Sequence, residues 1–127
     1  TPEQQLKRRE LVTALRSGKF KQGRGRLMDV LAARGMCCLG VACEISGLSQ
    51  FDPEGYFELG NNRNYPPAQV NELFGFDKYG TFAWGQPSLR VQIIDSYASN
   101  LVTLNDAGWT FAQIADLIEE RWEVAAE

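Results

Sequence analysis

The most apolar run of the chain is Met36-Cys-Cys-Leu-Gly-Val-Ala-Cys-Glu-Ile-Ser-Gly47, and it decides how the rest can fold. Its apolar positions repeat every three to four residues, which is the spacing of a helix face. Gly40 and Ala42 are small enough to let a neighbouring segment approach closely, and Gly47 is placed to end the helix. We therefore expect this run to form a central buried helix on which the other elements pack.

The helix with the clearest local signals follows Trp109. Thr110 and Gln113 have the spacing of a capping box, and Trp109 and Ile114 have that of a hydrophobic staple. Apolar and acidic side chains then separate onto two faces of the helix. The expected apolar face comprises Phe111, Ile114, Ala115, Ile118 and Trp122, and the acidic face comprises Asp116, Glu119, Glu120 and Glu123.

Another helix is expected at the beginning of the chain. Thr1 is a suitable cap, Pro2 suits the first helical position, and Ser17-Gly18 ends the helix. Its apolar residues come after the cationic run at positions 7–9, so we expect Lys7, Arg8 and Arg9 to lie in solvent.

The middle of the chain contains shorter elements. A short helix is expected from Pro66-Pro67 to Gly75. Apolar residues between Ser88 and Asn105 have the spacing of a helix. A strand is possible for the first part of this segment, and a helix is expected from about Asp95 to Asn105. Residues 28–35 suit either a helix or a connection between two strands, 56–59 suit a strand, and 78–85 suit a strand or an aromatic-lined loop.

Length and composition indicate one domain over residues 1–127. The chain is 44% hydrophobic, which argues against disorder, and no apolar run reaches the roughly 20 residues of a membrane span. No signal peptide is recognised, and the cysteine pattern suits a reducing compartment. We expect an α+β fold, a compact helix-rich domain with a small antiparallel sheet or hairpins.

Charge is distributed unevenly along the chain. Residues 1–34 carry a net charge of +6 and the remainder carries −9, which together give the total of −3. Such asymmetry suggests an anionic partner for the basic part. The alternative is that the two parts attract each other.

The basic charge is densest in Lys19-Phe-Lys-Gln-Gly-Arg-Gly-Arg-Leu27. Gly23 and Gly25 allow positive φ angles that bring backbone N–H groups toward a ligand, and Arg24 and Arg26 offer forked donors to phosphate or carboxylate. The loop matches neither a phosphate-binding Walker loop nor a dinucleotide fingerprint. It therefore suits either an anion site or a tight turn with solvated charges.

Histidine is absent from the chain, which excludes Ser–His–Asp and Cys–His catalysis and the common tetrahedral zinc sites. Cys37, Cys38 and Cys43 are an odd number and a poor disulfide framework. At the start of a helix, Cys37 would have a lowered pKa and a reactive thiol. Its apolar neighbours favour the alternative, a cysteine buried in the core.

Asn105-Asp-Ala-Gly108 separates two expected helices, an arrangement superficially like a helix-turn-helix. The acidic second helix would face a phosphate backbone of the same sign, which disfavours DNA binding. Asn105 and Asp106 suit a capping or bracing role, with contact to a ligand as a second possibility.

Three segments together resemble small uncharacterised proteins of tailed phages. They are Leu15-Arg-Ser-Gly-Lys-Phe-Lys-Gln-Gly-Arg-Gly-Arg-Leu27, Cys37-Cys-Leu-Gly-Val-Ala-Cys-Glu44 and Leu104-Asn-Asp-Ala-Gly-Trp-Thr-Phe-Ala-Gln-Ile-Ala115. The resemblance implies a small accessory protein in the bacterial cytoplasm. It also suggests an anti-defence role, either by sequestering a nucleotide signal or by covering a host protein.

The leading functional hypothesis is a non-enzymatic protein that binds an anionic ligand, a nucleotide or its cyclic derivative, without a metal or cofactor. The candidate binding residues are Lys19, Lys21, Gly23, Arg24, Gly25, Arg26, Asn105 and Asp106. The alternative is an inhibitor that docks its acidic C-terminal helix on a host defence protein or nucleic-acid-binding protein. A homo-oligomer is compatible with the sequence, and an enzyme ranks third.

Overall fold

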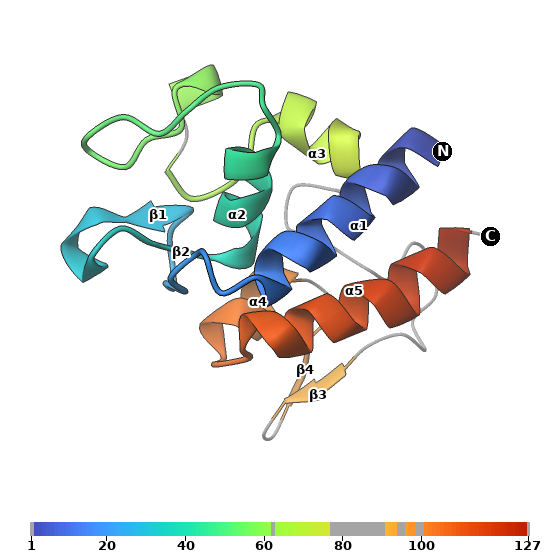
Figure 1. Ribbon diagram of the computed structural model, residues 1–127. Coiled ribbons are helices and arrows are strands. Elements are labelled where there is room, and N and C mark those ends of the chain that lie inside the picture. The colour runs from blue at the N-terminus through green and yellow to red at the C-terminus, as the bar shows by residue number, and fades with distance from the viewer. Residues whose placement is uncertain (1, 62, 77–90, 94–95, 99–100, 127) are drawn as a thin grey trace.

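The computed structural model describes residues 2–61, 63–76, 91–93, 96–98 and 101–126, and gives the backbone alone for 32, 91–93, 96–98 and 121–126. Within these residues the chain forms five α-helices and two antiparallel two-stranded sheets (Figure 1). The expected helix-rich α+β fold is confirmed. No helix in this part of the chain is both long and apolar enough to cross a membrane.

Helix α2 (Cys38–Ile45) is the central buried helix that the apolar run predicts. Each of its first six residues is buried, and α1 and α4 pack against it. Gly47 follows the helix with a φ of +74°, the left-handed conformation that ends a helix most easily at glycine. The burial of α2 on several sides makes it the element that positions the others.

Helices α1 (Pro2–Arg16) and α5 (Phe111–Ala126) lie side by side although they come from opposite ends of the chain (Figure 1). Leu11 and Leu15 of α1 are buried, as are Ile114 and Ile118 of α5. Each such side chain contributes about 1.5–3 kcal/mol when it is buried. The packing of α1 against α5 therefore joins the two ends of the chain and stabilises the fold.

Arg8 corrects the expectation that the cationic run of α1 lies in solvent. Its side chain is 1% exposed, and Nη1 donates a 2.7 Å hydrogen bond to the carbonyl oxygen of Phe74. That carbonyl ends helix α3 (Ala68–Phe74), where the helix dipole favours a cation. Lys7 is partly exposed and pairs with Glu10, and Arg9 is exposed, as expected.

Residues 28–35 form a hairpin rather than a helix. Strand β1 (Met28–Asp29) pairs with β2 (Gly35–Met36), and a single 3-10 turn, Val30–Ala32, joins them. Ala33 and Arg34 both have positive φ, which a continuous α-helix does not allow. The connection between two strands was thus the correct alternative for this segment.

The predicted helix from Asp95 is wrong for its first part. Residues 91–98 contain β3 (Val91–Ile93) and β4 (Ser96–Ala98), which pair with each other, and α4 (Leu101–Asp106) begins only afterwards. The apolar residues at 93, 97 and 101 are four apart, and this spacing suits a strand of period two as well as a helix. The alternative of a strand before Asp95 is confirmed.

The short helix α3 is confirmed, with Gly75 at its end in the left-handed conformation. The strand expected at 56–59 is reduced to one bridge between Phe51 and Phe57, followed by the 3-10 turn Leu59–Asn61. The segment 78–85 and the cap at Thr1 lie outside the described residues.

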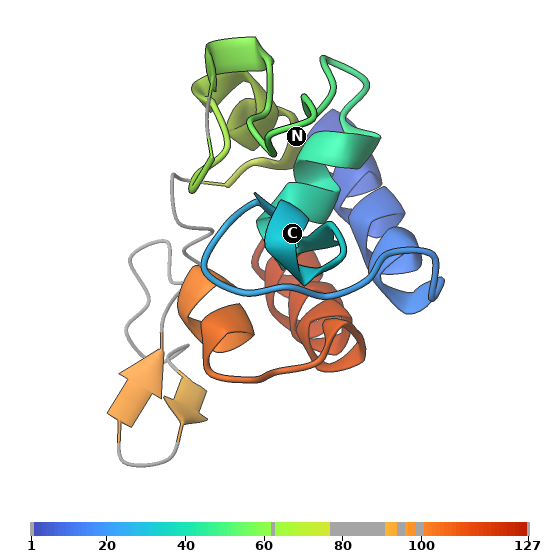
Figure 2. The same cartoon turned by 90° about the vertical axis from the view of Figure 1, so that its left-hand side faces the viewer.

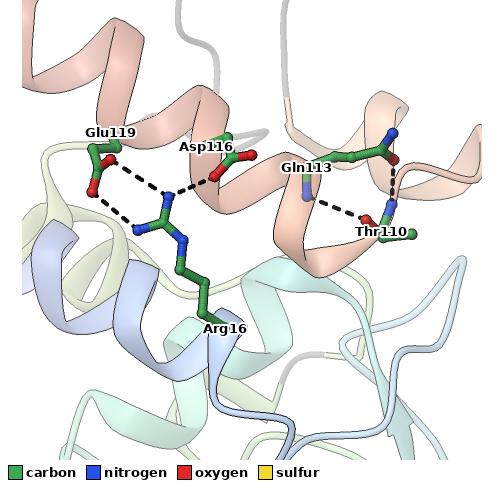
Figure 3. Close-up of polar contacts among 5 residues, drawn as sticks. All are labelled: Arg16, Thr110, Gln113, Asp116 and Glu119. Atoms are coloured by element: carbon green, nitrogen blue, oxygen red, sulfur yellow. Dashed lines mark hydrogen bonds and ion pairs between the residues drawn. The ribbon is translucent and has the colours of Figure 1, made fainter.

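The capping box of α5 is confirmed (Figure 3). The Gln113 side-chain oxygen accepts a hydrogen bond from the Thr110 N–H at 2.9 Å, and the Gln113 N–H donates to the Thr110 hydroxyl at 3.2 Å. The expected apolar face is buried at Phe111, Ile114, Ala115 and Ile118, and Leu117 joins it. The side chains of Trp122 and Glu123 lie outside the described part.

The Thr110→Ala variant should lose about 1 kcal/mol of folding free energy, because the N–H of Gln113 loses its acceptor. Urea denaturation followed by circular dichroism measures this difference. The Thr110→Ser variant keeps the hydroxyl and is the control. Equal stability of the alanine and wild-type proteins would show that the cap contributes nothing.

Candidate functional site

The basic loop, the start of α2 and the α4–α5 turn, three segments far apart in the sequence, meet at one hydrogen-bonded cluster. In Figure 2 the loop of residues 17–27 crosses the face turned to the viewer, above the α4–α5 turn. Gln22 joins the two: its Nε2 donates to the Asn105 side-chain oxygen at 2.9 Å and to the Trp109 carbonyl at 2.6 Å. Its Oε1 accepts from the Phe111 N–H at 3.1 Å. The loop is therefore attached to the turn by a side chain that the sequence did not single out.

Asn105 is the centre of this cluster and is 0% exposed. Besides Gln22, its Oδ1 accepts a hydrogen bond from the Cys38 N–H at 3.2 Å. Its Nδ2 donates to the carbonyl oxygen of Gly23 at 2.8 Å. One amide thus connects α4, the start of α2 and the basic loop. The bracing role is the one that the geometry supports, and a buried side chain presents no surface to a ligand, so we assign Asn105 to the framework.

Gly23 also serves the framework. It is buried, its N–H donates to the Met36 carbonyl at 2.7 Å, and a Cβ atom would lie 2.7 Å from the Gly35 carbonyl oxygen. Its φ is not positive, in contrast to the expectation from the sequence. The residue must be glycine because two backbone segments touch here.

Gly25 adopts the expected positive φ, +79°, at an exposed position. Its N–H donates to the Asp106 Oδ1 at 2.9 Å, so the loop N–H already holds an anion that belongs to the chain. Asp106 is exposed at the end of α4. The glycine geometry therefore suits an oxyanion, and Asp106 is the one that occupies it.

A pocket of about 280 Å³ lies next to this contact. Its lining residues are Gly25, Arg26, Cys37, Asn64, Tyr65, Val102 and Asp106. Arg26 is half-buried and forms no ion pair with any carboxylate of the described residues. Tyr65 contributes an aromatic ring to the pocket wall. The pocket combines a cation, a carboxylate, an amide and an aromatic ring.

The other three cations of the loop do not reach this pocket. Lys19 lines a separate groove along α1, and the Lys21 side chain is exposed. Arg24 is exposed and lies beside Gly108, where a Cβ atom would be 3.4 Å from its Nη2. The predicted cationic cluster is therefore dispersed, and Arg26 alone combines partial burial with a pocket.

Cys37 lines the pocket, but its chemistry is the opposite of a reactive thiol. Burial raises its pKa to about 11 from the usual 9.0. The sulfur accepts a hydrogen bond from the Gly40 N–H at 3.4 Å and so caps α2. The thiol stays neutral near pH 7, and the interpretation of a buried core cysteine is correct. Cys38 and Cys43 are buried as well, and burial raises both pKa values.

Thiol labelling should show this protection. With an aromatic disulfide reagent at pH 8, the folded protein should react at a small fraction of the rate seen in urea, since thiolate is the reacting form. In urea all three cysteines should react quickly. Fast labelling of one thiol in the folded protein would restore the reactive-thiol hypothesis for Cys37.

The acidic face of α5 is engaged by the basic part of the chain (Figure 3). Arg16 of α1 donates to Asp116 at 2.6 Å and to Glu119 at 3.0 Å. The side chains of the two acids nevertheless remain 70% and 55% exposed. Attraction between the two oppositely charged parts, the alternative interpretation of the charge asymmetry, is thus realised at Arg16.

Comparison with known proteins places the chain in one family. The model of a family described as a domain of unknown function, DUF8296, matches residues 3–122 and so includes all three segments of the cluster. No curated protein and no solved structure is significantly similar to the chain. Because the match covers nearly the whole sequence, the chain belongs to the DUF8296 family.

Proposed function

We propose that this protein is a non-enzymatic binding protein for a small anionic ligand, a nucleotide signal, and that Arg26 is the main anion contact. The observation that carries the proposal is the half-buried Arg26 side chain, since Arg26 lines a pocket and has no carboxylate partner among the described residues. A partly desolvated guanidinium gains much more from a bidentate phosphate than an exposed one does.

The pocket walls and volume favour a ligand of mononucleotide size. The 280 Å³ volume falls just below the range of about 300–1,000 Å³ typical of ligand sites, which is small for a cyclic dinucleotide. The Tyr65 ring can stack on a base. Asp106 repels phosphate but accepts hydrogen bonds from hydroxyl or amino groups, so the phosphate belongs at the Arg26 end.

The resemblance to small tailed-phage proteins supplies the setting that we propose. In the cytoplasm of an infected bacterium, a binding protein of this kind would act by sequestering a nucleotide that the host uses as a defence signal. Sequestration needs affinity and abundance, and it needs no catalytic group. This mode of action agrees with the neutral thiol of Cys37 in the pocket and with the absence of histidine from the chain.

Calorimetric titration with the four nucleoside 5′-monophosphates tests the proposal. The Arg26→Ala variant should bind at least about tenfold more weakly, which corresponds to 1.4 kcal/mol. Lys19→Ala is the matched control, because it removes a cation of the same loop from a different groove, and it should change affinity by less than about twofold. Equal losses in both variants would mean diffuse charge attraction and would remove the pocket from the proposal.

The second candidate is an interaction inhibitor that uses the acidic face of α5. The exposure of Asp116 and Glu119 favours it, because both carboxylates can still meet a basic partner. We rank it second since Arg16 already neutralises part of their charge. Reversing Asp116, Glu119 and Glu120 to lysine should abolish such an activity and leave nucleotide binding intact.

A further inference from the structure

One face of α1 lies outside the core and lines a groove of about 520 Å³. The lining positions on α1, namely 6, 9, 10, 13 and 14, lie on one face of the helix over about two turns, so the groove follows the helix axis. Phe20 and Ile45, both partly buried, form part of its floor. This groove is separate from the Arg26 pocket, and the proposed function does not use it.

The groove has an apolar projection at one end and an apolar recess at the other. Leu6, near the beginning of α1, is 57% exposed. About 12 Å further along the helix, Ala14 lines the groove together with Phe20 and Ile45, and its small side chain leaves a recess there. Between the two ends stand adjacent residues of opposite charge, Arg9 and Glu10.

We propose that this face binds a second copy of the chain, with the two α1 helices antiparallel. A two-fold axis between positions 9 and 10 sets Leu6 of each copy toward the recess near Ala14 of the partner subunit. The same axis sets Arg9 beside Glu10 of the partner subunit. By symmetry it also sets Glu10 beside Arg9 of the partner subunit. A surface of this kind is self-complementary, which is the condition for a closed two-fold dimer.

Arg9 and Glu10 favour this occupant, because adjacent residues of opposite sign suit a partner with the same pair in reverse order. Lys19, which also lines the groove, stands outside this pair. Glu10 pairs with Lys7 of its own helix at 3.1 Å, yet its side chain stays 46% exposed and can accept a second cation.

The dimer should be weak. A single helix face buries less than the roughly 1,200 Å² of a standard stable interface, so we expect a dissociation constant on the order of 100 µM. Association should therefore be visible only at high protein concentration and should be in rapid exchange.

Sedimentation velocity from about 10 µM to about 1 mM tests the proposal. The wild type should pass from monomer to dimer over this range, and Leu6→Glu should remain monomeric. The matched control is Leu31→Glu, because Leu31 is 90% exposed on the β1–β2 hairpin, away from the groove, and the control should dimerise like the wild type. A wild type that stays monomeric overturns the proposal, as does an equal loss in both variants.

Charge reversal separates reciprocal pairing from a change in stability. Arg9→Glu and Glu10→Arg should each weaken self-association at least about fivefold, because like charges then meet across the axis. An equimolar mixture of the two variants should form a heterodimer, since each copy now carries the complement of the other. Failure of the mixture to associate more strongly than either variant alone would exclude this axis.

Discussion

The Gly40→Ala variant is expected to lose at least about 3 kcal/mol of folding free energy. Gly40 lies within α2, where alanine would ordinarily stabilise the helix by about 1 kcal/mol. In this fold, however, a Cβ atom would stand 1.9 Å from the Leu27 carbonyl oxygen. Neither the central helix nor the loop can move away easily, because the Cys37 N–H donates to that same oxygen. Replacing this helical glycine by alanine should therefore lower the free energy of unfolding, whereas helix propensity alone would raise it.

Urea denaturation of the Gly40→Ala and Gly47→Ala variants measures the effect. At Gly47 nothing lies within 4 Å of the added Cβ, so only the cost of a positive φ, about 1 kcal/mol, should appear. The account expects the loss at Gly40 to be clearly the larger of the two. A Gly40→Ala protein as stable as the wild type would show that Leu27 does not lie against α2.

The Asn105→Ala variant is expected to lose about 3–5 kcal/mol, since two buried backbone groups would be left without a hydrogen-bond partner. These groups are the Cys38 N–H and the Gly23 carbonyl, which Asn105 satisfies at 3.2 and 2.8 Å. Gln22 would also lose one of its contacts, although the Trp109 carbonyl would still hold it. The basic loop should consequently be held less firmly to the α4–α5 turn, by the contacts of Gln22 with Trp109 and Phe111 and of Gly25 with Asp106.

Hydrogen exchange adds a local readout to the stability measurement. In Asn105→Ala the exchange rates of the Gly23 and Cys38 amides should rise, relative to the wild type, by more than those of α3, which lies outside the cluster. The control variant Asn64→Ala carries the same substitution at an exposed position, and its folding free energy should fall by less than about 0.5 kcal/mol. Equal stability losses at positions 64 and 105 would contradict the role of Asn105 as a brace.

The elements that were predictable from the sequence are those whose signals are local. Thr110 and Gln113 cap α5 through contacts three residues apart, and Gly47 and Gly75 end their helices by their own backbone conformation. The burial of α2 follows from composition alone, because an uninterrupted apolar run has no stable place in water. In each case the cause lies within a few residues of its effect.

The errors share the opposite property. Arg8 was assigned to solvent, and its acceptor, the Phe74 carbonyl, comes 66 residues later. The strand β4 was predicted as helix because apolar residues four apart fit both periods. The sequence around Arg8 does not indicate that the end of α3 will accept its hydrogen bond. The sequence of β4 likewise does not indicate that it will pair with β3.

The structure separates the residues that the sequence grouped into one candidate site. Gly25, Arg26 and Asp106 do line one pocket, whereas Lys19, Lys21 and Arg24 do not, and Gly23 and Asn105 serve the framework. Gln22 was missed, although a polar residue with both a donor and an acceptor beside a glycine loop is a signal for such bracing. Charge density along the chain cannot show which cation is partly buried, because burial depends on segments far away in sequence.

Native mass spectrometry of the protein purified from infected or defence-active bacteria tests the central claim most directly. The spectrum is recorded first intact and then after denaturation, so that any small molecule is released and weighed. The account predicts an added mass of mononucleotide size, present with the wild type and lost with Arg26→Ala. A bare wild-type protein, or one that retains its ligand in the Arg26→Ala variant, would contradict the proposal that Arg26 holds an anionic ligand.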